Sequence, residues 1–310
     1  MTFRSYFAAL VTGGGLLVGD PALPPPLPVP GRPAVEVVAR GLDNPRGLAF
    51  GSRGELYVAE AGRGGPCHAG AAGGTVCAGR SGAITIVEFG RQWRVTPGLP
   101  SLASPAGTGA SGPSDVVAGA GGEPILTVGA DGSAPARLYR GGDVLAEVGG
   151  DPAAILDTGR GWLVVDAQSR ALRRVNPRGR LQTVAVLPDR APLAPGSVTG
   201  GPDGAWFVGE RSRTGAVRPG AARIWRVESG RPPVVWATGF TEVVGLAWSS
   251  DGGLYVLERD ALFRIGRDHV RRPVAGGLKD AGGLALRGGY AYVSTCSRCT
   301  DTGTVLRIRQ

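Results

Sequence analysis

The feature of this sequence that most constrains its fold is an internal repeat of paired apolar segments. A Gly- or Pro-containing turn leads into one short apolar run, a Gly/Asp turn follows, and a second run closes the pair, often on an acid. The second runs occupy residues 56–60, 125–129, 162–166, 206–210, 254–258 and 291–295. Their ends lie 37 to 69 residues apart, about 47 on average. A period in the forties built from short strands is typical of a β-propeller with one blade per repeat.

Each repeat supplies four extended segments. The runs that precede the second strands are residues 46–50, 114–118, 152–156, 196–199, 244–248 and 282–286. Two further runs follow in the first repeat, at 83–88 and 92–96, and in the fifth, at 261–265 and 271–275. We therefore predict an all-β fold, a six-bladed β-propeller with four strands per blade.

The two ends of the repeat region predict how the ring closes. The sixth repeat ends on its third strand, residues 304–308, and an unassigned strand is present at residues 35–39. If this N-terminal strand completes the last blade, the ring closes and no sheet edge stays open.

Composition and the N-terminal segment set the remaining organisation. The chain has 54 Gly and 25 Pro, which disfavours long helices, and no apolar run is long enough for an integral membrane segment. Residues 1–22 resemble a weak signal peptide, and residues 23–34 form a Pro-rich linker. We expect a secreted or extracytoplasmic protein whose propeller spans residues 35–310.

The chain is strongly basic, with 34 basic against 25 acidic residues and a formal charge of +9. The basic residues are mostly dispersed, and no stripe of them is interleaved with aromatic residues that could stack on bases. We therefore expect no nucleic-acid partner.

The four cysteines form two local pairs, Cys67 with Cys77 and Cys296 with Cys299. Two local pairs in an exported chain favour two disulfide bonds. A shared zinc site and free thiols are the alternatives; the nine residues between Cys67 and Cys77 are a wide spacing for half of a zinc site.

Part of the sequence resembles a known family. Residues 41–50 and 56–67, with 98–102 and 107–116, resemble the ScyD/ScyE family of NHL-like propellers, and the similarity is best over residues 35–120. The resemblance implies an exported six-bladed propeller. It implies no catalytic residues, because the family has no established mechanism.

Acidic and amide side chains recur where a propeller exposes its channel face. The turn that enters an inner strand and the turn that leaves a second strand lie on the same face, around the channel. The candidates for a channel-face ligand or metal site are Glu60, Asp115, Asp166, Glu210, Glu258 and Asn44. Converging oxygen atoms could hold Ca²⁺. The alternative is that each acid accepts hydrogen bonds from the backbone N–H groups of the neighbouring turn.

These observations favour an exported, non-catalytic binding or scaffolding propeller that uses its channel face for a small ligand or a partner protein. No nucleophile–base pair can be assembled, and neither His68 nor His269 is expected in the channel, so the sequence leans away from an enzyme. The alternative is a Ca²⁺-dependent hydrolase of the sugar-lactone propeller type. We expect a monomer; the sequence does not identify the ligand or partner.

Overall fold

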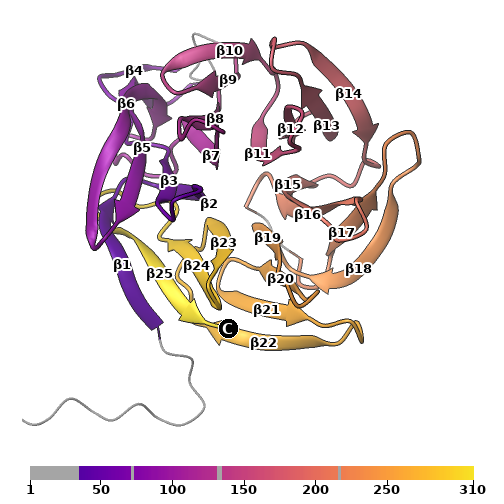
Figure 1. The fold of residues 1–310 in the computed structure, drawn as a ribbon. Coiled ribbons are helices and arrows are strands. Elements are labelled where there is room, and N and C mark those ends of the chain that lie inside the picture. The colour runs from indigo at the N-terminus through magenta and orange to yellow at the C-terminus, as the bar shows by residue number, and fades with distance from the viewer. Residues whose placement is uncertain (1–34, 71–72, 131–134, 216–217) are drawn as a thin grey trace, which may run out of the picture. The chain divides into compact units, whose positions relative to one another are not determined.

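The computed structural model describes residues 35–70, 73–130, 135–215 and 218–310, and in these ranges six antiparallel sheets surround a central channel (Figure 1). The described residues contain no helix. The six-bladed, all-β prediction is therefore confirmed. The predicted signal peptide and Pro-rich linker lie outside the described residues.

The strands follow the sequence repeat closely. Blade 1 consists of β2 (Pro45–Phe50), β3 (Leu56–Glu60), β5 (Thr75–Glu88) and β6 (Arg91–Ala103), with an additional short strand β4 (Cys67–Ala69) on β5. Blade 2 consists of β7 (Pro113–Ala118), β8 (Pro124–Val128), β9 (Arg137–Arg140) and β10 (Asp143–Glu147). Blade 3 consists of β11 (Pro152–Asp157), β12 (Trp162–Asp166), β13 (Ala171–Val175) and β14 (Leu181–Val186).

The second half of the ring repeats this order. Blade 4 consists of β15 (Leu193–Gly200), β16 (Trp206–Ser212), β17 (Ala222–Val227) and β18 (Val234–Phe240). Blade 5 consists of β19 (Gly245–Trp248), β20 (Leu254–Leu257), β21 (Ala261–Ile265) and β22 (Arg271–Gly276). Blade 6 consists of β23 (Gly283–Arg287), β24 (Tyr290–Thr295), β25 (Gly303–Arg309) and β1 (Val35–Leu42).

The ring closes through the N-terminal strand, as the sequence predicts. β1 pairs antiparallel with β25, so that Val35 faces Ile308 and Val37 faces Leu306. The chain then continues from β1 directly into blade 1. Because residues from both ends of the repeat region share one sheet, opening the ring requires the loss of a full strand pairing.

The core lies between the faces of neighbouring blades. Every residue of β3, β8 and β12 is buried, because these second strands are covered on both faces. One apolar cluster, for example, joins Ile125 of blade 2 to Ile155 and Val164 of blade 3. This two-sided burial explains why the second strands are continuous apolar runs rather than alternating patterns.

Glycines let the inner strands approach each other around the channel. A Cβ at Gly47 would lie 1.7 Å from the Oδ1 of Asp115, and one at Gly283 would lie 2.4 Å from the carbonyl oxygen of Arg46. At Gly245 a Cβ would lie 2.9 Å from the Cβ of Leu284 in the next blade. The channel is therefore narrow, and the side chains beside these glycines are held in defined places.

One region differs from the sequence-based expectation. We predicted the third strand of blade 1 at residues 83–88, but β5 begins at Thr75, β4 precedes it, and the start of β5 pairs with the end of β6. A Cβ at Gly65 would lie 2.6 Å from the carbonyl oxygen of Ala78, so these glycines permit close backbone packing rather than mark a loop.

Both cysteine pairs form disulfide bonds, and the described residues contain no free cysteine. Cys67–Cys77 joins facing residues of β4 and β5, while Cys296–Cys299 closes the turn between β24 and β25. This confirms the disulfide interpretation over zinc or free thiols, and it fits an extracellular protein. Within the described ranges, no helix is long and apolar enough to span a membrane.

Candidate functional site

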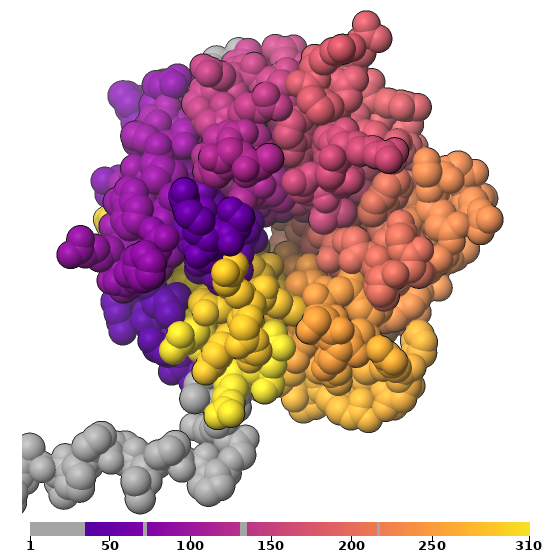
Figure 2. All heavy atoms as spheres, viewed as in Figure 1, coloured from indigo at the N-terminus to yellow at the C-terminus, as the bar shows by residue number. Residues whose placement is uncertain are grey.

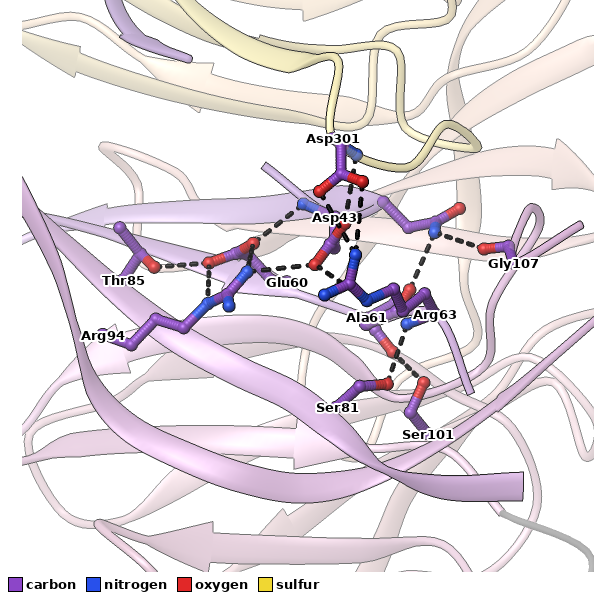
Figure 3. A network of polar contacts seen from close by, with 12 residues as sticks. Asp43, Glu60, Ala61, Arg63, Ser81, Thr85, Arg94, Ser101, Gly107 and Asp301 are labelled. Carbon is purple, nitrogen blue, oxygen red and sulfur yellow. Dashed lines mark hydrogen bonds and ion pairs between the residues drawn. The ribbon is translucent and has the colours of Figure 1, made fainter. Parts of the chain in front are cut away.

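The carboxylate that ends β3 is held inside blade 1 (Figure 3). Glu60 accepts a hydrogen bond from the backbone N–H of Asp43 at 2.8 Å, and Arg94 of β6 donates to both of its oxygens, at 3.1 and 2.9 Å. Arg94 also pairs with Asp43 at 3.0 Å. Asp43 in turn accepts from the backbone N–H of Asp301 at 3.0 Å, which joins blade 6 to blade 1. These contacts connect the end of β3 and the turn between β1 and β2 to the turn between β24 and β25 of blade 6.

Blade 3 uses the same arrangement. Asp166 ends β12 and accepts from the backbone N–H of Asp151 at 3.0 Å, while Arg173 lies 2.9 Å from its other oxygen. Burial alone would raise the pKa of Asp166, but hydrogen bonds from the Ser169 side chain and from the backbone hold the pKa below its ordinary value. Asp166 is therefore ionised and paired at neutral pH.

The acids of blades 4 and 5 are paired as well. Glu210 accepts from Arg190 at 2.7 Å and from the indole N–H of Trp225 at 2.8 Å. The remaining second-strand acid, Glu258, accepts from the backbone N–H of Thr241 at 2.7 Å and from Arg271 at 2.8 Å. Every second-strand acid thus has an arginine partner, which leaves it poorly suited to bind a cation.

Asn44 is also engaged with the backbone. Its side-chain amide donates to the carbonyl oxygens of Gly62 at 2.7 Å and Gly107 at 2.9 Å, and the residue is fully buried. The described residues contain no group of three or more His, Cys, Asp or Glu side chains that could hold a metal ion. The donor set of the predicted acid ring therefore does not fit Ca²⁺, because arginine already neutralises its four second-strand carboxylates and Asp115 does not converge with them.

A cavity of about 590 Å³ occupies the channel, lined by residues from all six blades. Figure 2 shows the hollow at the centre of the ring. Among the six predicted site residues only Asp115, from β7, contributes to its wall. Four arginines that the sequence analysis did not single out also line it: Arg46 from β2, Arg211 from β16, Arg213 and Arg259. We call Asp115, Arg46 and Arg211 the channel site.

Arg46 faces the cavity without a carboxylate partner among the described residues. Its only hydrogen bond from the guanidinium runs to the carbonyl oxygen of Ala110, at 3.0 Å. Burial, together with the positive charge of Arg211, lowers the pKa of Arg46 to about 10, while the negative charge of Asp280 opposes this effect. Burial is thus the main cause, and neighbouring guanidiniums add to it.

Arg211 is the second uncompensated cation. Its side chain crosses Gly196, where a Cβ would lie 2.4 Å from the Cδ of Arg211. The Nε of Arg211 is buried and has no hydrogen-bond partner among the described residues, and no ion pair involves this side chain there. A buried donor without an acceptor costs about 1–3 kcal/mol. Because this Nε is covered by the protein itself, an anion in the cavity reaches Arg211 only at the terminal nitrogens of its guanidinium.

Two neighbouring arginines, by contrast, are paired with carboxylates. Arg259 bridges Glu242 and Asp280, at 2.5 and 2.6 Å, and Arg298 contacts Asp280 at 3.1 Å. These guanidiniums are neutralised in place. Among the arginines of the cavity wall, Arg46, Arg211 and the exposed Arg213 have no carboxylate partner within the described residues.

Asp115 is the acidic member of the channel site. Its Oδ1 accepts from the backbone N–H of Val116 and its Oδ2 from that of Ile155, each at 2.9 Å. No ion pair within the described ranges involves its carboxylate. Burial raises the pKa of Asp115 to about 7, against the opposing effect of the two backbone hydrogen bonds.

The arginines could have been found by the rule that selected the acids. Arg46 lies at the entrance to an inner strand, and Arg211 directly follows an acid that closes a second strand. The same reasoning, that turns entering inner strands and leaving second strands lie on the channel face, would have placed both arginines near the channel. It would not have shown that they lack partners, because pairing depends on side chains from other strands.

Comparison with known proteins supports the fold. No protein-family model matches the chain, and no curated protein matches it significantly. The similar solved structures include a glucose dehydrogenase, with a TM-score of 0.59 and 15% identity, which aligns over 90% of this chain and 100% of the other.

Two further similar structures come from named bacteria. A gluconolactonase from Xanthomonas campestris has a TM-score of 0.54 and 13% identity, covering 90% of both chains. Virginiamycin B lyase from Staphylococcus aureus has a TM-score of 0.52 and 14% identity, covering 90% of this chain and 100% of the lyase. At these identities the likeness establishes the propeller fold that this chain shares with them.

Proposed function

We propose that the channel site binds a small organic anion. The observation that carries this proposal is the pair of guanidiniums of Arg46 and Arg211, which line a cavity and have no carboxylate partner in the part of the chain that the structure describes. The second-strand acids of the blades, by contrast, each have an arginine partner. Guanidinium groups match carboxylate and phosphate groups with two parallel hydrogen bonds. The cavity of about 590 Å³ lies within the range of small-molecule sites, roughly 300–1,000 Å³.

A matched pair of probes tests this function. Gluconate and glucose are similar in size, and only gluconate carries a carboxylate. We expect calorimetric titration to show binding of gluconate that weakens with added salt, and at least tenfold weaker or no binding of glucose. Equal binding of both probes, or no binding of gluconate, would reject an anion site.

Substitutions of the two arginines test whether gluconate binds in the channel. We expect Arg46→Gln and Arg211→Gln each to weaken gluconate binding about tenfold, because each removes one charge-assisted hydrogen bond. Arg231→Gln is the matched control, because Arg231 is an exposed arginine paired with Glu228 on the outside of blade 4. Unchanged affinity in both channel variants would place the anion elsewhere.

An enzyme acting on an anionic substrate is the second candidate. Asp115 favours it, because a carboxyl group with a pKa of about 7 beside bound substrate can accept or donate a proton. The lactonase alternative drawn from the sequence belongs to this class, and some similar structures bear the names of lactone- and sugar-directed enzymes. Hydrolysis of glucono-lactone by the wild-type protein and its loss in Asp115→Asn would support this candidate; equal rates in both would reject it.

We also propose that the protein is a ScyD/ScyE propeller and that it is exported. The residues at 41–50 and 56–67 support membership of the ScyD/ScyE propellers, and the two disulfides support export. N-terminal sequencing of protein recovered from outside the cytoplasm tests export, because a cleaved signal would leave a mature start near residue 23.

A further inference from the structure

We infer that the ligand of the channel site is a dianion, whose first anionic group lies between Arg46 and Arg211 and whose second lies at Arg213. This inference rests on the proposed anion-binding function and names the class of ligand that the site takes. It predicts that a dicarboxylate binds more tightly than the monocarboxylate of the same length.

Arg46 and Arg211 approach each other from opposite sides of the ring. Arg46 comes from β2 of blade 1 and Arg211 from β16 of blade 4, and these blades face each other across the channel (Figure 1). Both residues line the same cavity. After burial, the positive charge of Arg211 has the largest effect on the pKa of Arg46, which it lowers, so the two guanidiniums are near enough to repel each other. One anionic group between them would replace this repulsion with two attractions.

Both guanidiniums have donors left for such a group. Arg46 donates one hydrogen bond, to the carbonyl oxygen of Ala110 at 3.0 Å, and a guanidinium carries five N–H donors. Arg211 forms no ion pair within the described ranges, and its terminal nitrogens are the part that a ligand in the cavity reaches. Because a carboxylate has two oxygens that each accept hydrogen bonds, the two guanidiniums can share one carboxylate.

A third arginine offers a place for a second anionic group. Arg213 lines the cavity, is exposed, and has no carboxylate partner in the described part of the chain. It follows Arg211 by two residues, and its backbone N–H donates to the carbonyl oxygen of Pro192 at 3.1 Å, which continues the pairing of β15 with β16. Side chains two residues apart in an extended segment point to the same side, and their backbone positions are roughly 7 Å apart. The two carboxylates of an extended six-carbon diacid have a similar separation.

The acids of the cavity wall direct the anionic groups to the same side. Asp115 and Asp151 line the wall from blades 2 and 3. The remaining charged residue of the wall, Arg259, is already paired with Glu242 and Asp280. Negative charge on the two aspartates repels an anionic group, whereas the unpaired arginines attract it. A chain-shaped ligand therefore fits with its two anionic ends at the unpaired arginines and its uncharged, hydroxyl-bearing middle toward the acids.

A matched pair of ligands tests the inference. Glucarate differs from gluconate only in carrying a second carboxylate in place of the terminal alcohol, so the two ligands share their length and their other hydroxyl groups. We expect calorimetric titration of the wild-type protein to show glucarate binding about tenfold more tightly than gluconate, with a steeper loss of affinity as salt is added. If gluconate binds and glucarate binds no more tightly, the dianion is overturned while the anion site remains.

Substitution of Arg213 tests where the second carboxylate binds. We expect Arg213→Gln to reduce the advantage of glucarate over gluconate to about twofold or less, because one charge-assisted pair is lost. Arg213 is exposed, so this variant should fold like the wild type. Arg160→Gln is the matched control, because Arg160 is an exposed arginine between β11 and β12 that does not line the channel cavity and forms no ion pair within the described residues. It should keep the full advantage of glucarate.

The remaining outcomes separate the inference from the proposed function. A full advantage of glucarate in Arg213→Gln would place the second carboxylate elsewhere, and an equal loss in Arg160→Gln would assign the advantage to the overall charge of the protein. Either result would overturn the inference and leave the anion site intact. Failure of both gluconate and glucarate to bind would overturn the anion site and this inference together.

Discussion

Arginine side chains are paired with acids inside the blades but lack such partners in the channel. Arg94, Arg190 and Arg271 each neutralise an acid that closes a second strand, whereas Arg46 and Arg211 line a cavity and form no ion pair within the described residues. In the blades the guanidinium stabilises the fold. In the channel the positive charge of the guanidinium has no partner within the described residues, so it is available to a bound ligand. The difference teaches that function in this propeller follows from which charges remain unpaired, and not from which charged residues lie near the channel.

The largest expected effect comes from breaking a blade pair. Glu60→Ala removes the acceptor of the Asp43 backbone N–H and of Arg94, and leaves a partly buried guanidinium without its main partner. We expect the free energy of unfolding to fall by about 3 kcal/mol. Urea denaturation measures this, with Glu228→Ala, in a surface ion pair, as the control. A loss as small as in the control would mean that the blade pairs do not stabilise the fold.

A smaller loss is expected from adding a methyl group where Gly47 packs against Asp115. Gly47→Ala places a Cβ 1.7 Å from Oδ1 of Asp115, so the carboxyl group must move. We expect the free energy of unfolding to fall by about 2 kcal/mol, measured by urea denaturation. Gly276→Ala is the control, because no atom lies within 4 Å of a Cβ at that exposed position and its backbone is not left-handed. Equal stability of the two variants would mean that the Asp115 carboxyl group moves aside without cost.

Removing an unpaired arginine from the channel tests whether its charge serves ligand binding and not stability. Arg211→Gln removes a partly buried cation that forms no ion pair within the described residues, so we expect the free energy of unfolding to stay within about 0.5 kcal/mol of wild type or to increase. Gluconate affinity should nevertheless fall about tenfold. A stability loss comparable to that of Glu60→Ala would show that Arg211 has a structural role like that of the blade arginines.

A separate prediction concerns stability and pH. Because the folded-state pKa of Asp115 is raised to about 7, its contribution to stability is complete below its unfolded-state value near 4 and is lost as pH rises to about 7. Asp115→Asn lacks this dependence, so the variant should gain up to about 4 kcal/mol relative to wild type between pH 4 and pH 7.5. Parallel stability curves for the two proteins would contradict the raised pKa.

The sequence predicted the ring well because the information is local and repeated. Each second strand, such as residues 162–166, is an apolar run bounded by turn residues, and six of them fix the number of blades. The closing strand could be predicted because residues 35–39 had no other partner. The extension of β5 was missed because its glycines serve close packing, which looks like a loop in composition.

The site was harder to predict because pairing is not local. Glu60 and Arg94 are 34 residues apart and meet only through the register of blade 1. Nothing in the sequence distinguishes Arg94, which is paired, from Arg46, which is not. Asp115 was selected by its place before an inner strand, but its burial and raised pKa depend on Gly47 and Ile155 from neighbouring blades.

A crystal structure of the protein with gluconate tests the central claim most directly. The account predicts carboxylate oxygens of gluconate within about 3 Å of guanidinium nitrogens of both Arg46 and Arg211, inside the channel. It also predicts that Arg94, Arg190 and Arg271 keep their carboxylate partners in the blades. Gluconate bound away from the channel, or Arg46 and Arg211 each paired with a carboxylate of the chain itself, would contradict it.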